Sequence, residues 1–260
     1  MEQYSKSKPE KGKHPLLERT FIHIPGIGSK TEKIIWSKGI ETWDHFLRYH
    51  GTVFSSSRDA YIRHQLSESK KRRHDIRFFR QRLSSEHIWR VFGSFRSKAV
   101  YLDIETTGGY QGINDITVIG LYDGNEYYSF VNGKNMEDFQ SAISSYDLMI
   151  TFNGSTFDLP FIRKWFRHIE LPPAHIDLRF LLRKIGYKGG LKKIERELGI
   201  NRESEICEMN GYDAVMLWKA YEWGDMEALN RLLKYNRADV VNLEPLMAFC
   251  YERMMRITLA

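Results

Sequence analysis

From residue 98 onward, short apolar runs separated by turn residues follow a pattern that is typical of β-strands. Three runs come first, and the Asp123-Gly124 pair between the second and the third predicts a tight hairpin. Two further runs follow, each after a segment with helical spacing, at about 135–145 and at FDLPFIRKWFRH. Three antiparallel strands followed by strand–helix–strand predict an α/β fold with a mixed sheet. The five predicted strands lie in KAVYLDIE, DITVIGLY, NEYYSFV, YDLMITFN and HIDL.

The rest of this region has the spacing of helices, which would flank the sheet. A helix is predicted over about 190–198, ending at Gly199, and another over about 212–223. Two or more helices are predicted from 226 to 256, and Pro245 should kink or break the last of them. We therefore assign residues 98–260 to one α/β domain.

The pattern of residues 1–97 predicts a smaller, mainly helical region, and its net charge differs from that of the rest of the chain. Residues 1–98 hold 21 Lys and Arg against 10 Asp and Glu, a net charge of +11, whereas residues 99–260 have a net charge of −5. A basic part beside an acidic part favours a polyanionic partner for the first. The alternative is a basic surface that is only solvated. Residues 1–18 are polar and Lys-rich and are expected to be mobile.

A Pro-Gly-Ile-Gly turn precedes the first predicted helix of this region. Ile34 and Ile35 are its expected apolar positions, with Trp36 as a further candidate, and Thr42 is the expected N-cap of a second helix. Two short helices around a glycine turn resemble a helix-hairpin-helix element, in which backbone N–H groups at a helix start can hold a nucleic-acid phosphate. An ordinary tight turn explains the glycines equally well.

One or two basic helices are predicted over residues 57–92. The aromatic and leucine positions of KKRRHDIRFFRQRL should face a core while its arginines stay in water, where together they could follow a phosphate backbone. For any single arginine, a solvated helix face is the simpler interpretation. The positions assigned to the core are Phe78, Phe79 and Leu83, and those assigned to solvent are Arg72, Arg73, Arg77 and Arg80.

Two carboxylates stand at the end of the first predicted strand. Asp103 and Glu105 are two positions apart, so their side chains should share one face. Adjacent carboxylates near a buried strand repel each other unless a positive charge compensates, and hard oxygen ligands suit Mg²⁺ or Mn²⁺. By itself the pair is also compatible with a solvated strand end.

Four other acidic or polar positions can join this pair. Asn153 and Asp158 follow another buried strand, where ligands of α/β sheets usually lie. Tyr235 and Asp239 are four positions apart and therefore share a helix face. Three of them have a simpler interpretation as well: Asp158 as a carboxylate at a helix start, Tyr235 as a half-buried aromatic residue, and Asp239 as a surface aspartate that pairs with a basic residue.

Taken in order, DIE, NGSTFD and YNRAD resemble the three motifs of the DEDD nucleases, which belong to the ribonuclease H-like, DnaQ-like superfamily. The tyrosine of the third motif is similar to that of the DEDDy branch, because the histidine branch would need His at position 234, where this chain has Lys234. The FIHIPGIG block and the length resemble the YprB-like group. The resemblance covers roughly residues 98–260 and implies a ribonuclease H-like mixed five-stranded sheet flanked by helices.

The resemblance also implies a reaction, which is the removal of nucleotides from a 3′ end with two divalent metal ions, Mg²⁺ or Mn²⁺, about 4 Å apart. It makes Asp103 the ligand that bridges both ions. Glu105 and Asp239 would hold the ion that activates water, and Asp158 would serve the other ion. Tyr235 would orient the attacking water.

Basic residues surround the predicted site, as a polyanionic substrate requires, and are dense over residues 163–196. Base stacking on Phe157 or Trp165 is conceivable, but core packing is the stronger expectation for both. Asp177 is a candidate for an additional or supporting carboxylate. The candidate substrate contacts are Thr106, Asn153, Phe157, Lys188 and Lys192.

The preferred function is therefore a metal-dependent 3′–5′ exonuclease acting on nucleic acid, with DNA favoured over RNA. The alternatives are a structure-specific endonuclease with the same site and a nucleic-acid-binding protein without activity. No apolar run of about 18 residues occurs, so no membrane span is expected. The two cysteines, Cys207 and Cys250, suggest neither a disulfide framework nor a zinc site, which favours a cytoplasmic protein.

Overall fold

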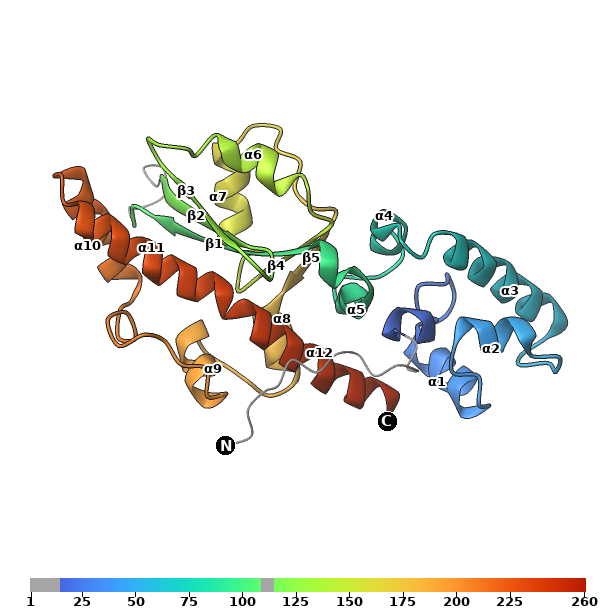
Figure 1. Cartoon of the computed structure of the whole chain (residues 1–260). Helices are drawn as coiled ribbons and strands as arrows, with labels where there is room; N and C mark the ends of the chain where they lie inside the picture. Colours follow the sequence, from blue (N-terminus) through green and yellow to red (C-terminus); the bar gives the residue numbers. More distant parts are fainter. Residues whose placement is uncertain (1–14, 109–114) are drawn as a thin grey trace. The chain divides into compact units, whose positions relative to one another are not determined.

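The computed structural model describes residues 15–108 and 115–260, and the chain forms two compact units, Met1–Phe95 and Arg96–Ala260 (Figure 1). Most of the polar segment predicted at residues 1–18 lies outside the described residues. Among the helices of the described part, none is long and apolar enough to cross a bilayer.

The N-terminal unit consists of short helices packed around aromatic side chains. Trp43 and Phe79 are fully buried and stack with ring centroids 6.0 Å apart. Inside the same unit, Glu32 and Arg90 form a buried ion pair at 2.9 Å. The helices are η1 (Leu16–Arg19), α1 (Ser29–Ser37), α2 (Trp43–Arg48), α3 (Ser56–Lys71), α4 (Ile76–Arg80), η2 (Ile88–Val91) and α5 (Phe92–Phe95).

The local predictions for this unit are largely confirmed. Thr42 caps α2 by accepting a hydrogen bond from the backbone N–H of His45 at 3.1 Å. Gly26 has a φ of +82°, which explains the glycine in the turn before α1. The core and solvent positions predicted around α4 are correct. Ile34 is the exception, because its side chain is 47% exposed whereas Ile35 is buried.

The C-terminal unit is built on a mixed five-stranded sheet in the order β3-β2-β1-β4-β5. β1 pairs antiparallel with β2 and parallel with β4, which confirms the predicted α/β fold. The central strands are buried on both faces because helices cover both. The strands are β1 (Ala99–Thr106), β2 (Ile116–Tyr122), β3 (Tyr127–Val131), β4 (Leu148–Thr151) and β5 (Ala174–Asp177).

One face of the sheet packs against α6 (Asp138–Ile143) and α7 (Asp158–Trp165) through a cluster that includes Leu102, Ile104 and Phe139. The other face packs against α10 (Gly211–Glu222) and α11 (Met226–Val241) through Val118, Trp218 and Leu232. In Figure 1, α11 crosses the sheet on the side opposite to α6 and α7. The remaining helices are η3 (Arg96–Lys98), α8 (Leu178–Lys184), α9 (Leu191–Glu197) and α12 (Leu243–Leu259).

The break predicted near Pro245 occurs three residues earlier. α11 ends at Val241, Asn242 separates the helices, and α12 begins at Leu243. Pro245 therefore lies in the first turn of α12, where its missing N–H costs no helical hydrogen bond.

Candidate metal centre

The first two acids of the site come from the end of β1. The Cα of Asp103 pairs with that of Gly120 on β2, and that of Glu105 pairs with Val118, before the register shifts between Glu105 and Thr106. Asp103 is half-buried and Glu105 is buried. Both point to the α11 face, since the Nδ2 of Asn236 on α11 donates to Asp103 Oδ2 at 3.2 Å and to Glu105 Oε1 at 3.4 Å.

Helix α11 contributes Tyr235, Asn236 and Asp239 to the same place. All three are buried, and the spacing of four puts Tyr235 and Asp239 one turn apart. The helix can approach the sheet because position 120 is glycine. A Cβ there would lie 2.0 Å from Asn236 Oδ1 and 2.8 Å from a methyl carbon of Val240. An isolated glycine within an apolar strand is a sign of such close contact, and the sequence interpretation missed it.

Asp103, Glu105 and Asp239 form one compact acidic group. One carboxylate oxygen from each can be chosen so that all lie within 4.8 Å of one another. Asp158 is not in this group, but it is the first residue of α7 and is 2% exposed. Its Oδ1 accepts the backbone N–H of Ile104, next to Asp103, at 3.1 Å. The structure thus brings all four predicted acids and Tyr235 together at the end of β1.

Burial and mutual repulsion make these acids hard to ionise without a cation. Removal from water, followed by the charges of neighbouring acids, raises the pKa of Asp103 and Glu105 well above the usual range. Burial also raises the pKa of Asp158 to about 7, although two backbone N–H groups oppose the rise. Burial raises the pKa of Asp239, and Arg202 opposes it. A set of crowded carboxylate oxygens fits a hard divalent cation, which would remove this penalty.

Basic side chains lie against the same acids. Lys192 on α9 is half-buried, and its Nζ is 4.4 Å from the ring centroid of Tyr235. Arg202, in the loop between α9 and α10, donates to Asp239 and to Glu195. Burial, with the nearby acids, raises the pKa of Tyr235, so this hydroxyl stays protonated. No sequence signal pointed to Arg202, because a loop residue lacks helical or strand periodicity.

The other predicted substrate contacts fall into different environments. Thr106 is half-buried at the end of β1, and Lys188 is exposed between α8 and α9. Asn153 has a φ of +67°, and its side chain accepts from Arg179 and from Thr156, so it already has partners within the protein.

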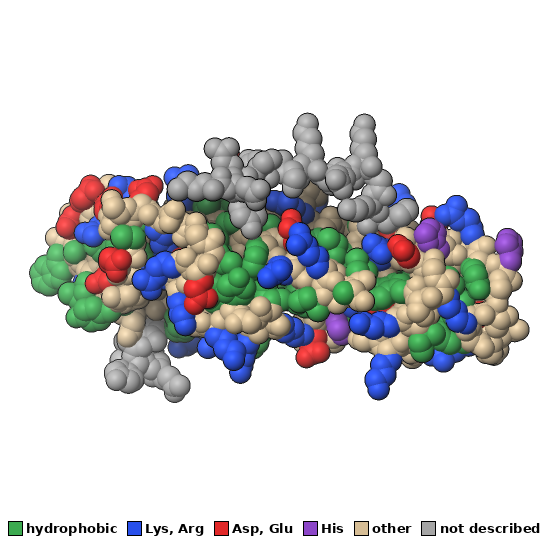
Figure 2. Space-filling model, turned by 90° about the horizontal axis from the view of Figure 1, so that it is seen from below, with side chains coloured by type: hydrophobic (Ala, Val, Ile, Leu, Met, Phe, Trp, Pro, Cys, Tyr) green, Lys and Arg blue, Asp and Glu red, His purple; other side chains and the backbone are tan. Residues whose placement is uncertain are grey.

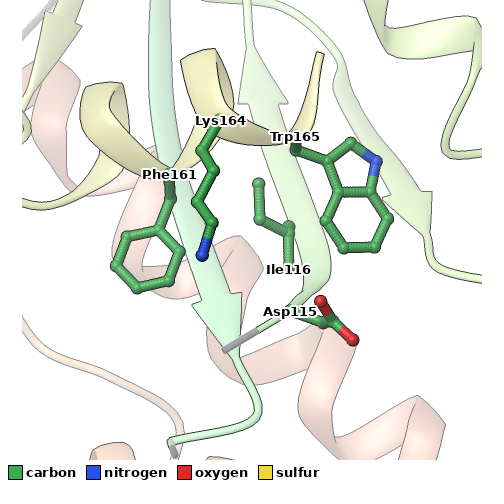
Figure 3. A pocket seen from close by; sticks show the side chains of 5 residues that line it. All are labelled: Asp115, Ile116, Phe161, Lys164 and Trp165. Carbon is green, nitrogen blue, oxygen red and sulfur yellow. The ribbon is translucent and has the colours of Figure 1, made fainter. Parts of the chain in front are cut away.

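Phe157 corrects the expectation of core packing. It is 40% exposed, and its ring centroid lies 4.9 Å from that of Phe161. Its place directly before the buried Asp158, at the start of α7, turns it outward. Trp165 is half-buried against the core, as expected, and it lines a cavity of about 250 Å³ (Figure 3). In Figure 3 Phe161, Lys164 and Trp165 descend from one helix toward Asp115 and Ile116.

Asp177 positions a loop and is not part of the compact acidic group. Its Oδ1 accepts the backbone N–H groups of Asn153 at 2.8 Å and Arg179 at 3.1 Å, and its Oδ2 accepts that of Ser155 at 3.0 Å. These bonds fix the turn that connects β4 to α7, and therefore the start of the helix at Asp158.

The match to a family model agrees with this architecture. The family model of the RNase_H superfamily matches residues 100–251, whereas no curated protein matches the chain. The family B DNA polymerase from the archaeon Pyrobaculum calidifontis is a similar solved structure, at 14% identity and a TM-score of 0.48. The alignment covers 57% of this chain and 24% of the polymerase, so this chain spans about a quarter of that length.

Two further solved structures are similar to this chain. Brucella melitensis NrnC with bound Mg²⁺ is 20% identical with a TM-score of 0.45, over 65% of this chain and 79% of that one. Escherichia coli RNase D, an exoribonuclease involved in structured RNA processing, is 18% identical with a TM-score of 0.44, over 66% and 47%. The family match spans more than half of the chain and all three acidic segments. The chain is therefore a member of the RNase H superfamily.

Proposed function

We propose that this protein is a metal-dependent 3′–5′ exonuclease of the DEDDy type, in the YprB-like group, and that it hydrolyses phosphodiester bonds of nucleic acid. One observation carries the proposal: acids from three distant segments, on β1, α7 and α11, meet beside a buried tyrosine. Membership of the RNase H superfamily supports nuclease chemistry. DNA is the favoured substrate and RNA is the alternative.

The acids would hold the cations with the roles that the resemblance implies. Asp103 would contact both ions, Glu105 and Asp239 one of them, and Asp158 the other. When bound, two divalent cations supply an activated water and stabilise the leaving oxygen. The compact group of Asp103, Glu105 and Asp239 suits the ion that Glu105 and Asp239 would hold. Asp158 lies outside that group, which suits its role as a ligand of the other ion.

The other side chains would bind and orient the substrate. Tyr235 stays protonated, so its hydroxyl can donate a hydrogen bond and orient the attacking water. Lys192 lies over its ring and can offer its ammonium group to a phosphate oxygen. Lys188 and Thr106 are proposed to contact the strand nearby. The exposed Phe157 can stack on an unpaired base.

An oligonucleotide assay tests this function. A 5′-labelled strand with Mg²⁺ or Mn²⁺ should give a ladder that shortens from the 3′ end, and EDTA should stop the reaction. A circular single strand should stay intact. Internal cuts on the circle would instead support an endonuclease, and the absence of any cleavage would support a binding protein.

Replacing Asp103 tests whether cleavage depends on the acidic group. We expect Asp103→Asn to abolish cleavage, because it removes a shared negative ligand, while the affinity for the oligonucleotide stays within about threefold, since phosphate contacts dominate affinity. Asp138→Asn, an exposed acid on α6, is the matched control and should cleave normally. Cleavage by Asp103→Asn at the wild-type rate would refute the assignment.

A further inference from the structure

Arg202 is a buried arginine whose position is fixed by two carboxylates from different elements. Its side chain is 4% exposed, and its Nε and Nη2 bond to the two carboxylate oxygens of Glu195 at 2.7 and 2.8 Å. The same Nη2 also donates to Oδ1 of Asp239, on α11. The guanidinium is planar, so holding one edge on Glu195 aims this donor at a defined point.

Glu195 is held equally firmly. It lies on α9, its side chain is 1% exposed, and Oε1 also accepts Nδ2 of Asn242 at 3.0 Å. Asn242 is the residue that separates α11 from α12. Asn242 thus holds Glu195, Glu195 holds Arg202, and Arg202 holds one carboxylate oxygen of Asp239, Oδ1.

The charges of this arrangement are the informative part. An arginine alone beside the acidic group would repel an incoming cation. Its positive charge would also neutralise the carboxylate of Asp239 and so compete with a metal ion for it. Glu195 pairs with Arg202 and cancels its charge, so Asp239 keeps its own negative charge for a metal ion. A ligating carboxylate needs such supporting hydrogen bonds to be oriented.

We propose that Glu195 and Arg202 form a charge-neutral clamp that sets the orientation of Asp239 for a divalent cation. Arg202 is the positioning residue, and Glu195 holds Arg202 and neutralises it. This inference rests on the proposed function, because it assumes that the acidic group binds a metal. It adds two residues outside the three motifs, Glu195 and Arg202, in a segment that the motifs do not predict.

A second buried pair in the same chain provides the matched control. Glu32 and Arg90 bond at 2.9 Å with side chains 1% and 3% exposed, and Glu32 also accepts the backbone N–H groups of Phe21 and Ile22. All of these partners belong to the N-terminal unit. Breaking this pair should lower stability without changing the orientation of Asp239.

The test is to measure the binding of Mn²⁺ to the 260-residue chain by calorimetry, at pH 7.5 and without nucleic acid. Glu195→Gln with Arg202→Met removes the clamp but leaves the net charge unchanged, so any change reflects orientation. We expect the Kd for Mn²⁺ to rise 10- to 100-fold. Glu32→Gln with Arg90→Met should leave this Kd within about twofold, and the melting temperature of each protein reports its stability.

Kinetics give an independent readout. With the clamp removed, kcat should fall while KM for the oligonucleotide stays within about twofold, because phosphate contacts are unchanged. Should the double variant not fold, Arg202→Lys replaces it: the charge remains, but one ammonium group cannot hold both carboxylates in the same geometry. Its expected Kd for Mn²⁺ is about three- to tenfold higher than that of the wild type.

The possible failures are distinguishable. If a folded clamp variant binds Mn²⁺ as tightly as the wild type, the inference is wrong while the proposed function stands. If the wild type does not bind Mn²⁺, or if Asp103→Asn binds it equally well, the proposed function fails and the inference fails with it.

Discussion

At the scale of single residues, the acids show how far environment changes ordinary chemistry. Asp158 is a good example, since a helix-start aspartate is normally ionised and stabilised by the helix dipole. Here its carboxylate is buried and also faces Asp177 and Asp239, so its pKa rises to about 7 despite two backbone hydrogen bonds. The simple interpretation of this residue as a carboxylate at a helix start would miss that its charge destabilises the fold unless a cation is present.

The sign of this effect gives a pH prediction. A carboxyl whose pKa is higher in the folded chain than in the unfolded chain, where it is about 4, binds more protons when folded. Stability contributed by the protonated form is therefore lost as the pH rises from about 4 to about 7. In EDTA, Asp158→Asn should become more stable relative to the wild type between pH 5 and pH 8, by a few kcal/mol at most.

Thermal unfolding of both proteins across this pH range measures the difference. The comparison between the two proteins matters, because His23 has the opposite effect: burial lowers its pKa to about 3. That shift is common to both proteins and cancels. A difference in melting temperature that does not change with pH would contradict the prediction.

At the scale of elements, the site depends on the close packing of α11 on β1 and β2. Gly120 permits it, and Asn236 completes it by donating to two acids while its Oδ1 accepts the hydroxyl of Tyr127 at 2.9 Å. The β1–β2 register places Gly120 opposite Asp103. A change in one strand residue should therefore affect side chains on a helix more than a hundred positions later.

Gly120→Ala tests this packing. Its new methyl would overlap Asn236 and Val240, so we expect a loss of stability of about 1–3 kcal/mol. Cleavage should fall more than binding to the oligonucleotide does. Gly133→Ala is a useful contrast, because a Cβ there meets no atom within 4 Å, although its φ of +76° adds local strain. Equal cleavage by Gly120→Ala and the wild type would show that α11 can shift without disturbing the acids.

At the scale of the whole molecule, the two units differ in their net charge. The N-terminal part carries the excess of Lys and Arg, and Arg77 and Arg80 are exposed on α4 while Phe78 and Phe79 are buried. Figure 2 shows many Lys and Arg side chains on the face that it presents. We propose, from this distribution, that residues 1–97 hold the phosphate backbone of the substrate, with the turn before α1 as a helix-hairpin-helix-like contact.

Removing exposed charge in the 260-residue chain tests this role. Arg77→Ala with Arg80→Ala should weaken binding of the oligonucleotide and reduce the slope of log K against log salt by about 1 to 2, since each lost phosphate contact lowers that slope by nearly one. Arg253→Ala with Arg256→Ala, exposed on α12, changes the net charge equally. An identical salt slope for both pairs would argue against an arm in the N-terminal unit.

The sequence alone determined the strand and helix order, because apolar runs and turn residues are local signals. The resemblance of three short motifs to those of the DEDD nucleases also singled out the four acids and Tyr235, and their role in catalysis stays a prediction. The tertiary structure decided what those signals cannot contain. The approach of α11 over Gly120, the exposure of Phe157 and the pairing of Arg202 with Asp239 all depend on contacts between segments distant in the chain. Such contacts leave no period in the sequence, so only the folded chain defines them.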